Sequence, residues 1–517
     1  MFVVVGSGPA GVACAHALLQ GGATVTMLDA GIELDPDRRN RVMHLRAKSA
    51  SQWKPDELAF LRKGVEVSGA GIPLKLAYGS SFPYGDPGWP PIAQDGVDGK
   101  PSFARGGLSN VWGASVLPFR AEEMEGWPIG REDLAPHYRA VLGFMPFAAR
   151  SDGLAGSFPL FHDHPGRLEN SRQGTALLAD LERSRSTLRS HGVEFGASRL
   201  AVRAASKGGP GCVYCGLCMY GCPYDYIYNS ARTLDALREN PRFTYRSGVL
   251  VESLEEGDHG VQLVARELSG APAGVRADRV FIACGVFSTA RIVLSSLDAY
   301  EQTVKATDNC YFLLPLLRYR KQRHVAREPL HTLAQVFLEV NDPAVGPHVA
   351  HLQVYSFNEL YRRQFQNMFG PLGGVADRLL TGRTLIVQGY LHSELSPGIE
   401  LTLHREGRLE LAVSPNDRTR HALTALKRRL WLERSSLRAW PLSQALRVGR
   451  PGRGFHTGGT FPMRAQPRRL ESDALGTPHG FTRVHVVDSS VLPTLPATTI
   501  TLSVMANAHR IGAAVVE

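Results

Sequence analysis

The sequence predicts an α/β fold, α+β overall, in which a dinucleotide-binding domain is joined to a domain built on an antiparallel β-sheet. Three observations lead to this prediction. The chain opens with a strand, a glycine-rich loop, a helix and a second strand. A second strand–glycine–helix unit occurs at residues 279–291, and such units favour a doubly wound parallel sheet. From about residue 300 to 450 apolar and polar residues alternate, which is typical of antiparallel strands.

Composition narrows the possible functions. The chain has 517 residues and a net charge of +10, but no compact basic run interleaved with aromatics, so nucleic acid is not expected as a partner. No window of about twenty apolar residues predicts a transmembrane segment. No charged leader precedes the first strand, so we expect no signal peptide and a cytoplasmic location. The basic, apolar stretches at residues 311–327 and 426–438 leave a peripheral membrane location as an alternative.

The first thirty residues have the pattern of a Rossmann-like nucleotide-binding unit. The apolar run Phe2–Val5 predicts a buried strand, GSGPAG follows at residues 6–11, and a later strand ends on Asp29. In such a unit Gly6 makes the tight turn, Gly8 lets the backbone approach a pyrophosphate, and Gly11 lets the helix pack closely on the strand. Asp29 is placed to accept hydrogen bonds from a ribose.

The remaining elements follow in order. GGLSNVWG at residues 106–113 pairs glycines with a tryptophan, which allows backbone to approach a flat ligand. Residues 243–254 and 260–266 predict a hairpin, and residues 279–291 a strand that turns at Gly285 into a helix. Period-two strands are expected at Thr332–Val340, His348–Tyr355, Thr384–His392, Gly398–His404 and Arg408–Val413. A basic helix is expected at Arg420–Arg434 and a strand–loop–helix at residues 484–512.

The C-terminal part contains motifs that resemble those of a known family. FHTGGTFPM at residues 455–463 is followed by VVDSSVLPT at residues 486–494 and by an apolar segment from Thr499. Together with the N-terminal loop and GGLSNVWG, and in this order, they resemble the glucose–methanol–choline (GMC) family of flavoprotein oxidoreductases. The resemblance implies FAD as the cofactor and an enzyme that acts on CH–OH groups.

The resemblance also assigns residues to parts of the cofactor. It implies that Gly6, Gly8 and Gly11 hold the pyrophosphate, that Asp29 holds the adenosine ribose, where the family more often has Glu, and that the backbone of Val251 contacts adenine. It also implies that the isoalloxazine side is lined by Gly106, Gly107, Ser109 and Asn110, and that Asp488 lies near the pyrophosphate and the ribityl chain. We expect residues 1–150, 205–300 and 450–517 to form a discontinuous FAD-binding domain with a cysteine-rich insertion at 210–224. Residues 300–450, with part of 150–205, are expected to form the substrate-binding domain.

His456 falls on the family's catalytic histidine. Hydride transfer from an alcohol carbon requires the hydroxyl proton to leave, and a neutral imidazole can take it. The family usually has Asn or His eleven residues after the motif aspartate, where this chain has Thr499. Thr499 can donate or accept a hydrogen bond but cannot act as a base at neutral pH. Either His456 works with Thr499 orienting the substrate, or another residue, such as His392 or His404, completes the pair.

Four of the seven cysteines form the run Cys212-x-x-Cys215-x-x-Cys218-x-x-x-Cys222-Pro223. This is the spacing of bacterial ferredoxins, so an iron–sulfur cluster is predicted. Zinc fits less well, because zinc sites usually split two Cys pairs across a longer loop. Four cysteines that merely pack a turn are the structural alternative. The cluster is expected to be [4Fe–4S], completed by Cys222 or a distant ligand such as Cys310, or [3Fe–4S], as in similar iron–sulfur-containing sugar dehydrogenases.

These features together predict an FAD-dependent dehydrogenase. We expect it to oxidise an alcohol, most simply of a sugar or polyol, including glycan- or lipid-linked ones, with His456 as base. Electrons are expected to leave through the cluster to an external acceptor. The alternatives are an oxidase or redox-neutral flavoenzyme with structural cysteines, and an electron-transfer flavoprotein component.

Overall fold

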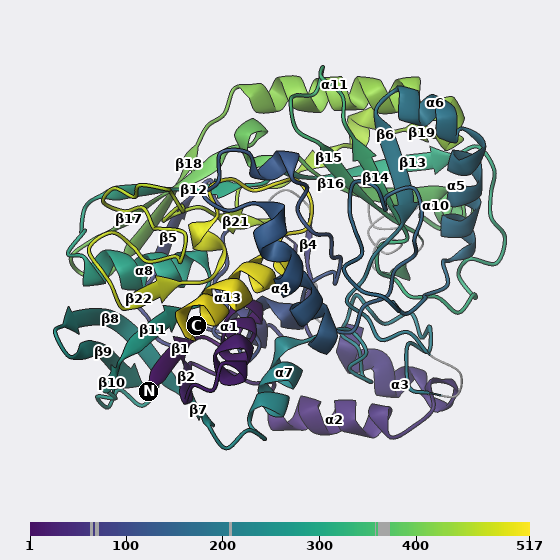
Figure 1. The fold of residues 1–517 in the computed structure, drawn as a ribbon. Helices are drawn as coiled ribbons and strands as arrows, with labels where there is room; N and C mark the ends of the chain where they lie inside the picture. Colours follow the sequence, from purple (N-terminus) through teal and green to yellow (C-terminus); the bar gives the residue numbers. More distant parts are fainter. Residues whose placement is uncertain (63–65, 68–71, 206–208, 357, 360–372, 517) are drawn as a thin grey trace.

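A computed structural model describes residues 1–62, 66–67, 72–205, 209–356, 358–359 and 373–516. A five-stranded parallel sheet has the order β22–β11–β1–β2–β7 (Figure 1). Its strands are β1 (Phe2–Val5), β2 (Val25–Asp29), β7 (Phe243–Ser247), β11 (Arg279–Ile282) and β22 (Val484–Val486). The two ends of the chain and its middle therefore build one sheet, as the two strand–glycine–helix units predict.

Helices cover this sheet. α1 (Pro9–Gln20) and the C-terminal helix α13 (Thr501–Val516) lie side by side in Figure 1, with α4 (Arg131–Phe144) packed on α13. α8 (Val286–Ser296) follows β11 and packs against β8 (Val249–Gly257). A small antiparallel sheet joins β8 to β9 (Gly260–Glu267) and β10 (Val275–Ala277). The predicted hairpin is confirmed for β8 and β9, but residues 243–247 of its expected first strand instead form β7 of the parallel sheet. In the parallel sheet, strands β1, β2, β11 and β22 are buried on both faces and are mostly apolar, whereas the edge strand β7 is largely exposed and mostly polar.

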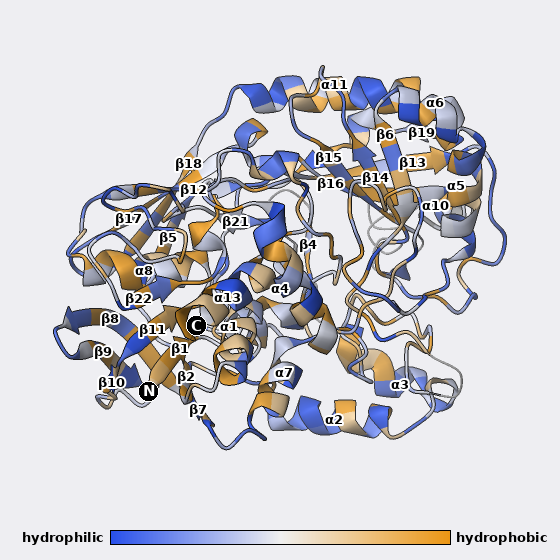
Figure 2. Cartoon of the chain, viewed as in Figure 1, coloured by the Kyte–Doolittle hydropathy of each residue, from blue (hydrophilic) through white to orange (hydrophobic). Residues whose placement is uncertain are grey.

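A second large sheet is antiparallel and has seven strands, in the order β19–β13–β16–β15–β14–β6 with β20 also on β13. The strands are β6 (Val193–Ala197), β13 (Tyr311–Arg318), β14 (Val336–Val340), β15 (Ala350–Tyr355), β16 (Thr384–Tyr390), β19 (Ala439–Pro441) and β20 (Arg447–Val448). One face packs on α5 (Arg172–Arg183) and α11 (Arg418–Leu432) around a buried apolar cluster. In Figure 2 α11 alternates between hydrophilic and hydrophobic residues, as expected for a helix with one side in solvent.

The expectation of one antiparallel sheet between residues 300 and 450 was incomplete. Three strands of this region form a third sheet with two strands from elsewhere in the chain. Its members, in order, are β21 (Thr457–Gly458), β12 (Thr303–Asp308), β17 (Gly398–Leu403), β18 (Leu409–Ser414) and β5 (Ile92–Asp95). Alternation predicts a strand but does not say which sheet it joins, because pairing partners lie far apart in sequence.

The core accounts for most apolar residues of the two stretches that suggested a membrane surface. Residues 311–318 form β13, whose side chains are mostly buried. In the stretch 426–438, Leu426, Leu430 and Leu437 are buried against the seven-stranded sheet. None of the helices in the described part of the chain is long and apolar enough to cross a bilayer. Packing accounts for these buried residues, whereas Trp431 and Leu432 of the second stretch are exposed.

The first glycine-rich turn is a packing constraint. Gly6 has a φ of +100°, and a Cβ at Gly11 would lie 2.0 Å from the Gly6 carbonyl oxygen. A Cβ at Gly8 would meet nothing within 4 Å. Gly11 therefore sets how closely α1 approaches the turn, whereas Gly8 leaves its backbone open to the adjoining space.

We predict that Gly11→Ala lowers the stability of the ligand-free protein by about 1–3 kcal/mol, because the methyl group meets rigid backbone. This cost exceeds the gain of about 1 kcal/mol that Ala has over Gly inside a helix. The thermal unfolding midpoint, followed by circular dichroism, is the measurement. Gly8→Ala is the matched control and should leave the midpoint unchanged. An unchanged or higher midpoint for Gly11→Ala would contradict the packing argument.

Candidate active site

One elongated cavity, of about 380 Å³, joins the parallel sheet to the seven-stranded sheet. Nine of the residues predicted from the sequence line it: Gly6, Gly8, Asp29, Gly107, Ser109, Val251, His456, Asp488 and Thr499. Three further predicted residues do not line the cavity and lie behind the residues that do: Gly11, Gly106 and Asn110. The N-terminal motif and the C-terminal motifs thus meet in one space, although more than four hundred residues separate Gly6 from His456.

The start of α1 forms one end of the cavity. The helix begins at Pro9 with Gly8 as its N-cap, and no side chain caps it. The first N–H groups of a helix have no partner within the helix, so they are available to an anion. Since Gly8 adds no side chain, a phosphate can approach this backbone closely.

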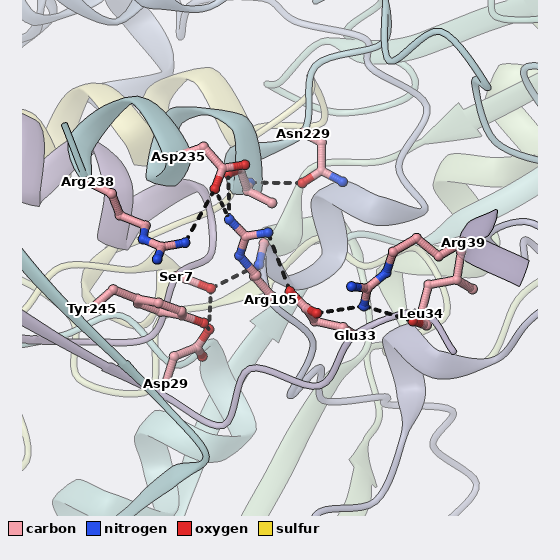
Figure 3. Close-up of polar contacts among 12 residues, drawn as sticks. Ser7, Asp29, Glu33, Leu34, Arg39, Arg105, Asn229, Asp235, Arg238 and Tyr245 are labelled. Atoms are coloured by element: carbon pink, nitrogen blue, oxygen red, sulfur yellow. Dashed lines mark hydrogen bonds and ion pairs between the residues drawn. The ribbon is translucent and has the colours of Figure 1, made fainter. Parts of the chain in front are cut away.

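Asp29 ends β2 beside this turn (Figure 3). Its Oδ2 accepts hydrogen bonds from the Ser7 hydroxyl and, at 3.0 Å, from the Tyr245 hydroxyl. Burial raises the pKa of Asp29 to about 6, and the hydrogen bonds from Ser7 and Tyr245 oppose that shift. Tyr245 lies on β7, and sequence reasoning missed it because nothing local relates β7 to β2.

The loop at residues 106–113 is held by a polar network behind the cavity wall. Gly106 N–H donates to the Ser7 hydroxyl at 2.9 Å, and Ser109 Oγ donates to the Gly106 carbonyl at 2.5 Å. Asn110 Nδ2 donates to the Gly107 carbonyl at 2.7 Å, and its Oδ1 accepts from Asn229 Nδ2 at 2.8 Å. Ser109 and Asn110 therefore hold the two glycines in shape, and only Ser109 of this pair also faces the cavity.

Asp488 lines the cavity and binds the start of the second strand–glycine–helix unit. Its carboxylate accepts from Gly285 N–H at 2.8 Å, from Thr289 Oγ1 at 2.5 Å and from Ser490 N–H at 2.9 Å. Burial raises the pKa of Asp488, whereas these hydrogen bonds lower it. The carboxylate fixes the start of α8 relative to the segment after β22.

His456 lies immediately before β21, at the other end of the cavity. Its ring stacks on Tyr390, with ring centroids 4.4 Å apart and planes inclined by 19°. Burial, with a smaller contribution from His351, lowers the pKa of His456 to about 3. Its Nδ1 has no hydrogen-bond partner among the described residues. His456 is therefore a neutral imidazole with an unsatisfied polar atom beside a cavity.

Thr499 lines the same cavity. Its hydroxyl oxygen accepts from the Leu117 N–H at 2.9 Å, which leaves the hydroxyl proton available for donation. The face of the seven-stranded sheet that meets the cavity is polar and aromatic, and alternate residues of β13, β15 and β16 supply it: Tyr311, Leu313, Gln353, Tyr355, Gln388 and Tyr390. Strand alternation could have marked these residues, but not the sheet face that meets the cavity.

Neither alternative partner of His456 reaches it. His392 is buried beside Glu123, with Nε2 3.5 Å from Oε2, and its ring stacks on His348 at 3.6 Å. His404 is hydrogen-bonded to Glu301 and Glu410 near the surface. Neither side chain lines the cavity, so the suggestion that one of them completes a catalytic pair was wrong.

The four clustered cysteines line a second, smaller cavity together with His331 and Leu333. All four are free thiols. Cys310, the suggested distant ligand, is instead buried in the apolar cluster under the seven-stranded sheet. Leu333 lines both cavities, and Met219 from the cysteine segment lines the larger one. The two cavities therefore share a wall.

The spacing of the thiols distinguishes between metals. Among the described residues, the groups of three or more His, Cys, Asp or Glu ligand atoms within 4.8 Å of one another are Glu123–His348–His392 and Glu301–His404–Glu406. Neither group contains a cysteine. A tetrahedral zinc ion with Zn–S bonds of about 2.3 Å needs its sulfurs about 3.8 Å apart. Among the described residues, no three of these cysteines therefore bring their sulfurs as close together as a zinc site requires.

Lys75 lies between the two sites and was not expected from the sequence. It lines the larger cavity, and its Nζ donates to the Trp112 carbonyl at 2.7 Å. Burial lowers the pKa of Lys75 to about 8, and the nearby Cys218 and Cys222 oppose that shift. Lys75 therefore brings an amino group to the wall of the larger cavity.

No family model and no curated protein matches this sequence. Solved structures do match. Pyridoxine 4-oxidase from Mesorbium loti aligns with a TM-score of 0.59 and 16% identity over 99% of this chain and 98% of its own. A formate oxidase structure aligns with a TM-score of 0.61 and 13% identity over 99% and 97%. A third, the R554A variant of Aspergillus oryzae formate oxidase from work on FAD modification, has a TM-score of 0.59, 15% identity, and 99% and 97% coverage.

The chain shares the fold of these oxidases. The likeness covers the length of both partners, and at these identities it concerns the fold. The predicted fold class, a Rossmann-like domain with a second domain on an antiparallel sheet, is confirmed.

We predict that His456 does not titrate between about pH 5 and 8, because its lowered pKa of about 3 keeps the ring neutral above that value. His404 is the internal comparison, since the hydrogen bonds that its ring donates to Glu410 and Glu301 raise its pKa above 6.5. NMR of histidine-labelled protein, assigned with His456→Asn and His404→Asn, measures both. A His456 midpoint near 6.5 would show that the ring is solvated.

Proposed function

We propose that this protein is an FAD-dependent oxidoreductase that oxidises an alcohol group of a small molecule, with His456 as the base. The observation that supports the proposal most strongly is the single cavity that joins the nucleotide-binding turn to a buried, neutral histidine. A nucleotide-binding module without catalysis would not need that histidine there.

The residues present fit FAD. The uncapped start of α1 and the open backbone at Gly8 suit the pyrophosphate, and Asp29 suits the ribose. Val251 lines the cavity on β8, where its backbone can contact adenine, and Gly107, Ser109 and Asp488 lie along the remaining wall. When bound, the flavin supplies an acceptor for the hydride that leaves the alcohol carbon.

The chain's own residues handle the hydroxyl proton. Oxidation of an alcohol breaks its C–H and O–H bonds and forms the C=O bond, so the proton needs an acceptor as the hydride departs. A neutral imidazole can take it, and the low pKa of His456 ensures that the ring is unprotonated beforehand. The ring lines the cavity, so a substrate hydroxyl or a linking water can approach the imidazole from that side.

Thr499 and the strand residues are proposed to orient the substrate. The Thr499 hydroxyl already accepts from Leu117, so it donates to the substrate oxygen. Gln353, Gln388 and Tyr355 place amide and hydroxyl groups on the cavity wall. The Tyr355 hydroxyl donates to Gln353 Oε1 at 3.1 Å, and Gln388 Nε2 donates to the Tyr390 hydroxyl at 2.5 Å. A hydrogen-bonded polar lining of this kind suits a molecule with several hydroxyls. We propose a sugar or polyol as the substrate class.

The final electron acceptor is proposed to be molecular oxygen. The similar structures named above are oxidases, which supports this choice over the dehydrogenase expected from the cysteine motif alone. If oxygen were not the electron acceptor, the proposed roles of FAD and His456 would be unaffected.

A second candidate is a dehydrogenase with a cluster in the cysteine cavity. One observation favours it: the four free thiols line one cavity that shares Leu333 with the larger cavity. The thiols would hold an iron–sulfur cluster, which supplies one-electron transfer when present. Residues at the wall shared by the two cavities would set the distance between the flavin and the cluster.

We predict that His456→Ala slows anaerobic flavin reduction by substrate about 10²–10⁴-fold, because the hydroxyl proton loses its acceptor. A panel of sugars and polyols, with flavin bleaching as the signal, first identifies a substrate for the wild-type protein. His404→Ala is the control and should reduce flavin normally. If His456→Ala reduced the flavin at the wild-type rate, the assignment of His456 as the base would be wrong.

A second prediction concerns the acceptor. Substrate-reduced protein mixed with oxygen should regain its oxidised flavin spectrum and release one peroxide per substrate oxidised. If oxygen reacts slowly and a one-electron dye reacts fast, the oxidase assignment fails and the dehydrogenase is favoured.

The cluster is tested by assaying iron and acid-labile sulfide after anaerobic purification. Cys218→Ser is expected to lose both, and Cys310→Ser is expected to keep them.

A further inference from the structure

His331 is the only histidine that lines the cysteine cavity in the described part of the chain. It is 2% exposed, and it belongs to a segment tied to the cysteine loop. The Leu330 N–H donates to the Tyr214 carbonyl at 3.0 Å, and Leu330 forms a β-bridge with Cys215. The position of His331 relative to the thiols is therefore set by backbone hydrogen bonding.

The protonated nitrogen of His331 follows from its neighbours. The backbone N–H of Ser171 donates to Gln335 Oε1 at 2.7 Å, and a backbone N–H can only donate. Gln335 Nε2 is therefore the donor end of the amide. It lies 3.2 Å from His331 Nδ1 and also donates to the carbonyls of His331 and Leu333, at 2.9 and 3.1 Å. If the Gln335 amide were flipped, its NH2 group would face the Ser171 N–H, and its oxygen would face the carbonyls of His331 and Leu333.

Because Nδ1 accepts from Gln335, the proton of the neutral ring is on Nε2. That N–H has no partner among the described residues. A ring that bound metal through Nε2 would instead carry its proton on Nδ1, facing the Gln335 N–H. Gln335 therefore disfavours His331 as a metal ligand and makes it a hydrogen-bond donor at the cavity.

We propose that His331 Nε2–H donates a hydrogen bond to a sulfur of the group held by the four cysteines and raises its reduction potential. The inference rests on the second candidate function, the cluster. A hydrogen bond to sulfur stabilises the reduced, more negative cluster over the oxidised one. His331 is thus a positioning residue for electron transfer, and Gln335 fixes its tautomer.

The test uses protein purified anaerobically and reconstituted with iron and sulfide. The iron and sulfide content and the cluster potential, from an EPR-monitored redox titration, are measured for wild type, His331→Phe and His331→Gln. His331→Phe should keep the cluster and shift its potential downward, and His331→Gln, which keeps a donor, should recover part of the shift. His485→Phe is the control, since His485 is equally buried and does not line the cysteine cavity.

The outcomes are distinct. An unchanged potential in His331→Phe with full iron content overturns this inference and leaves the cluster in place. Loss of iron from folded His331→Phe and His331→Gln also overturns it, because His331 would then be a ligand. Wild-type protein without iron or sulfide removes the cluster proposal itself, and the inference with it, while FAD and His456 stay untouched.

Discussion

The parallel pairing of β22, β11, β1 and β2 is the constraint on which the rest of the site depends. In a parallel sheet the carboxyl ends of neighbouring strands meet at one edge, where ligands bind in open α/β sheets. Gly6 follows β1, Asp29 ends β2, Gly285 follows β11 and Asp488 follows β22. Four short segments from the two ends and the middle of the chain therefore meet at one edge, and the close approach of α1 at Gly11 keeps that edge compact.

The seven-stranded sheet closes the space that this edge opens. Its polar face lies across the cavity from the nucleotide-binding turn, and β21, in the third sheet, positions His456 between them. The site is thus divided by chemistry: backbone N–H groups and a carboxylate at one end, and a neutral imidazole with hydroxyl and amide groups at the other. Burial, which lowers the pKa of His456 and raises that of Asp29, acts on both ends.

The cysteine cavity places four thiols behind the wall that it shares with the larger cavity. Leu333 contributes to both cavities, and Lys75 and His331 bring an amino group and an N–H donor toward the thiols from opposite sides of that wall. These groups come from three separate parts of the chain. The arrangement links the larger cavity to the four thiols through side chains that no motif contains.

Local patterns predicted the strand–turn–helix units and the residues whose chemistry depends on them. Gly6, Asp29, the cysteine run and His456 were identified because each lies in a short motif with a conformational or chemical requirement. Tyr245, Tyr390, Gln353, Lys75 and His331 were missed, because each is an ordinary residue in its own segment. Their positions at the sites depend on strand pairing over long sequence separations, as the division of the 300–450 strands between two sheets also does.

The sequence by itself determined the two strand–glycine–helix units, the run of thiols and the histidine motif, because backbone conformation and side-chain chemistry follow from neighbouring residues. The tertiary structure decided that His456 is stacked and neutral, that His392 and His404 lie elsewhere, and that the thiols share a wall with the larger cavity. Burial and hydrogen-bond partners come from segments hundreds of residues apart, and only the folded chain brings those segments into contact.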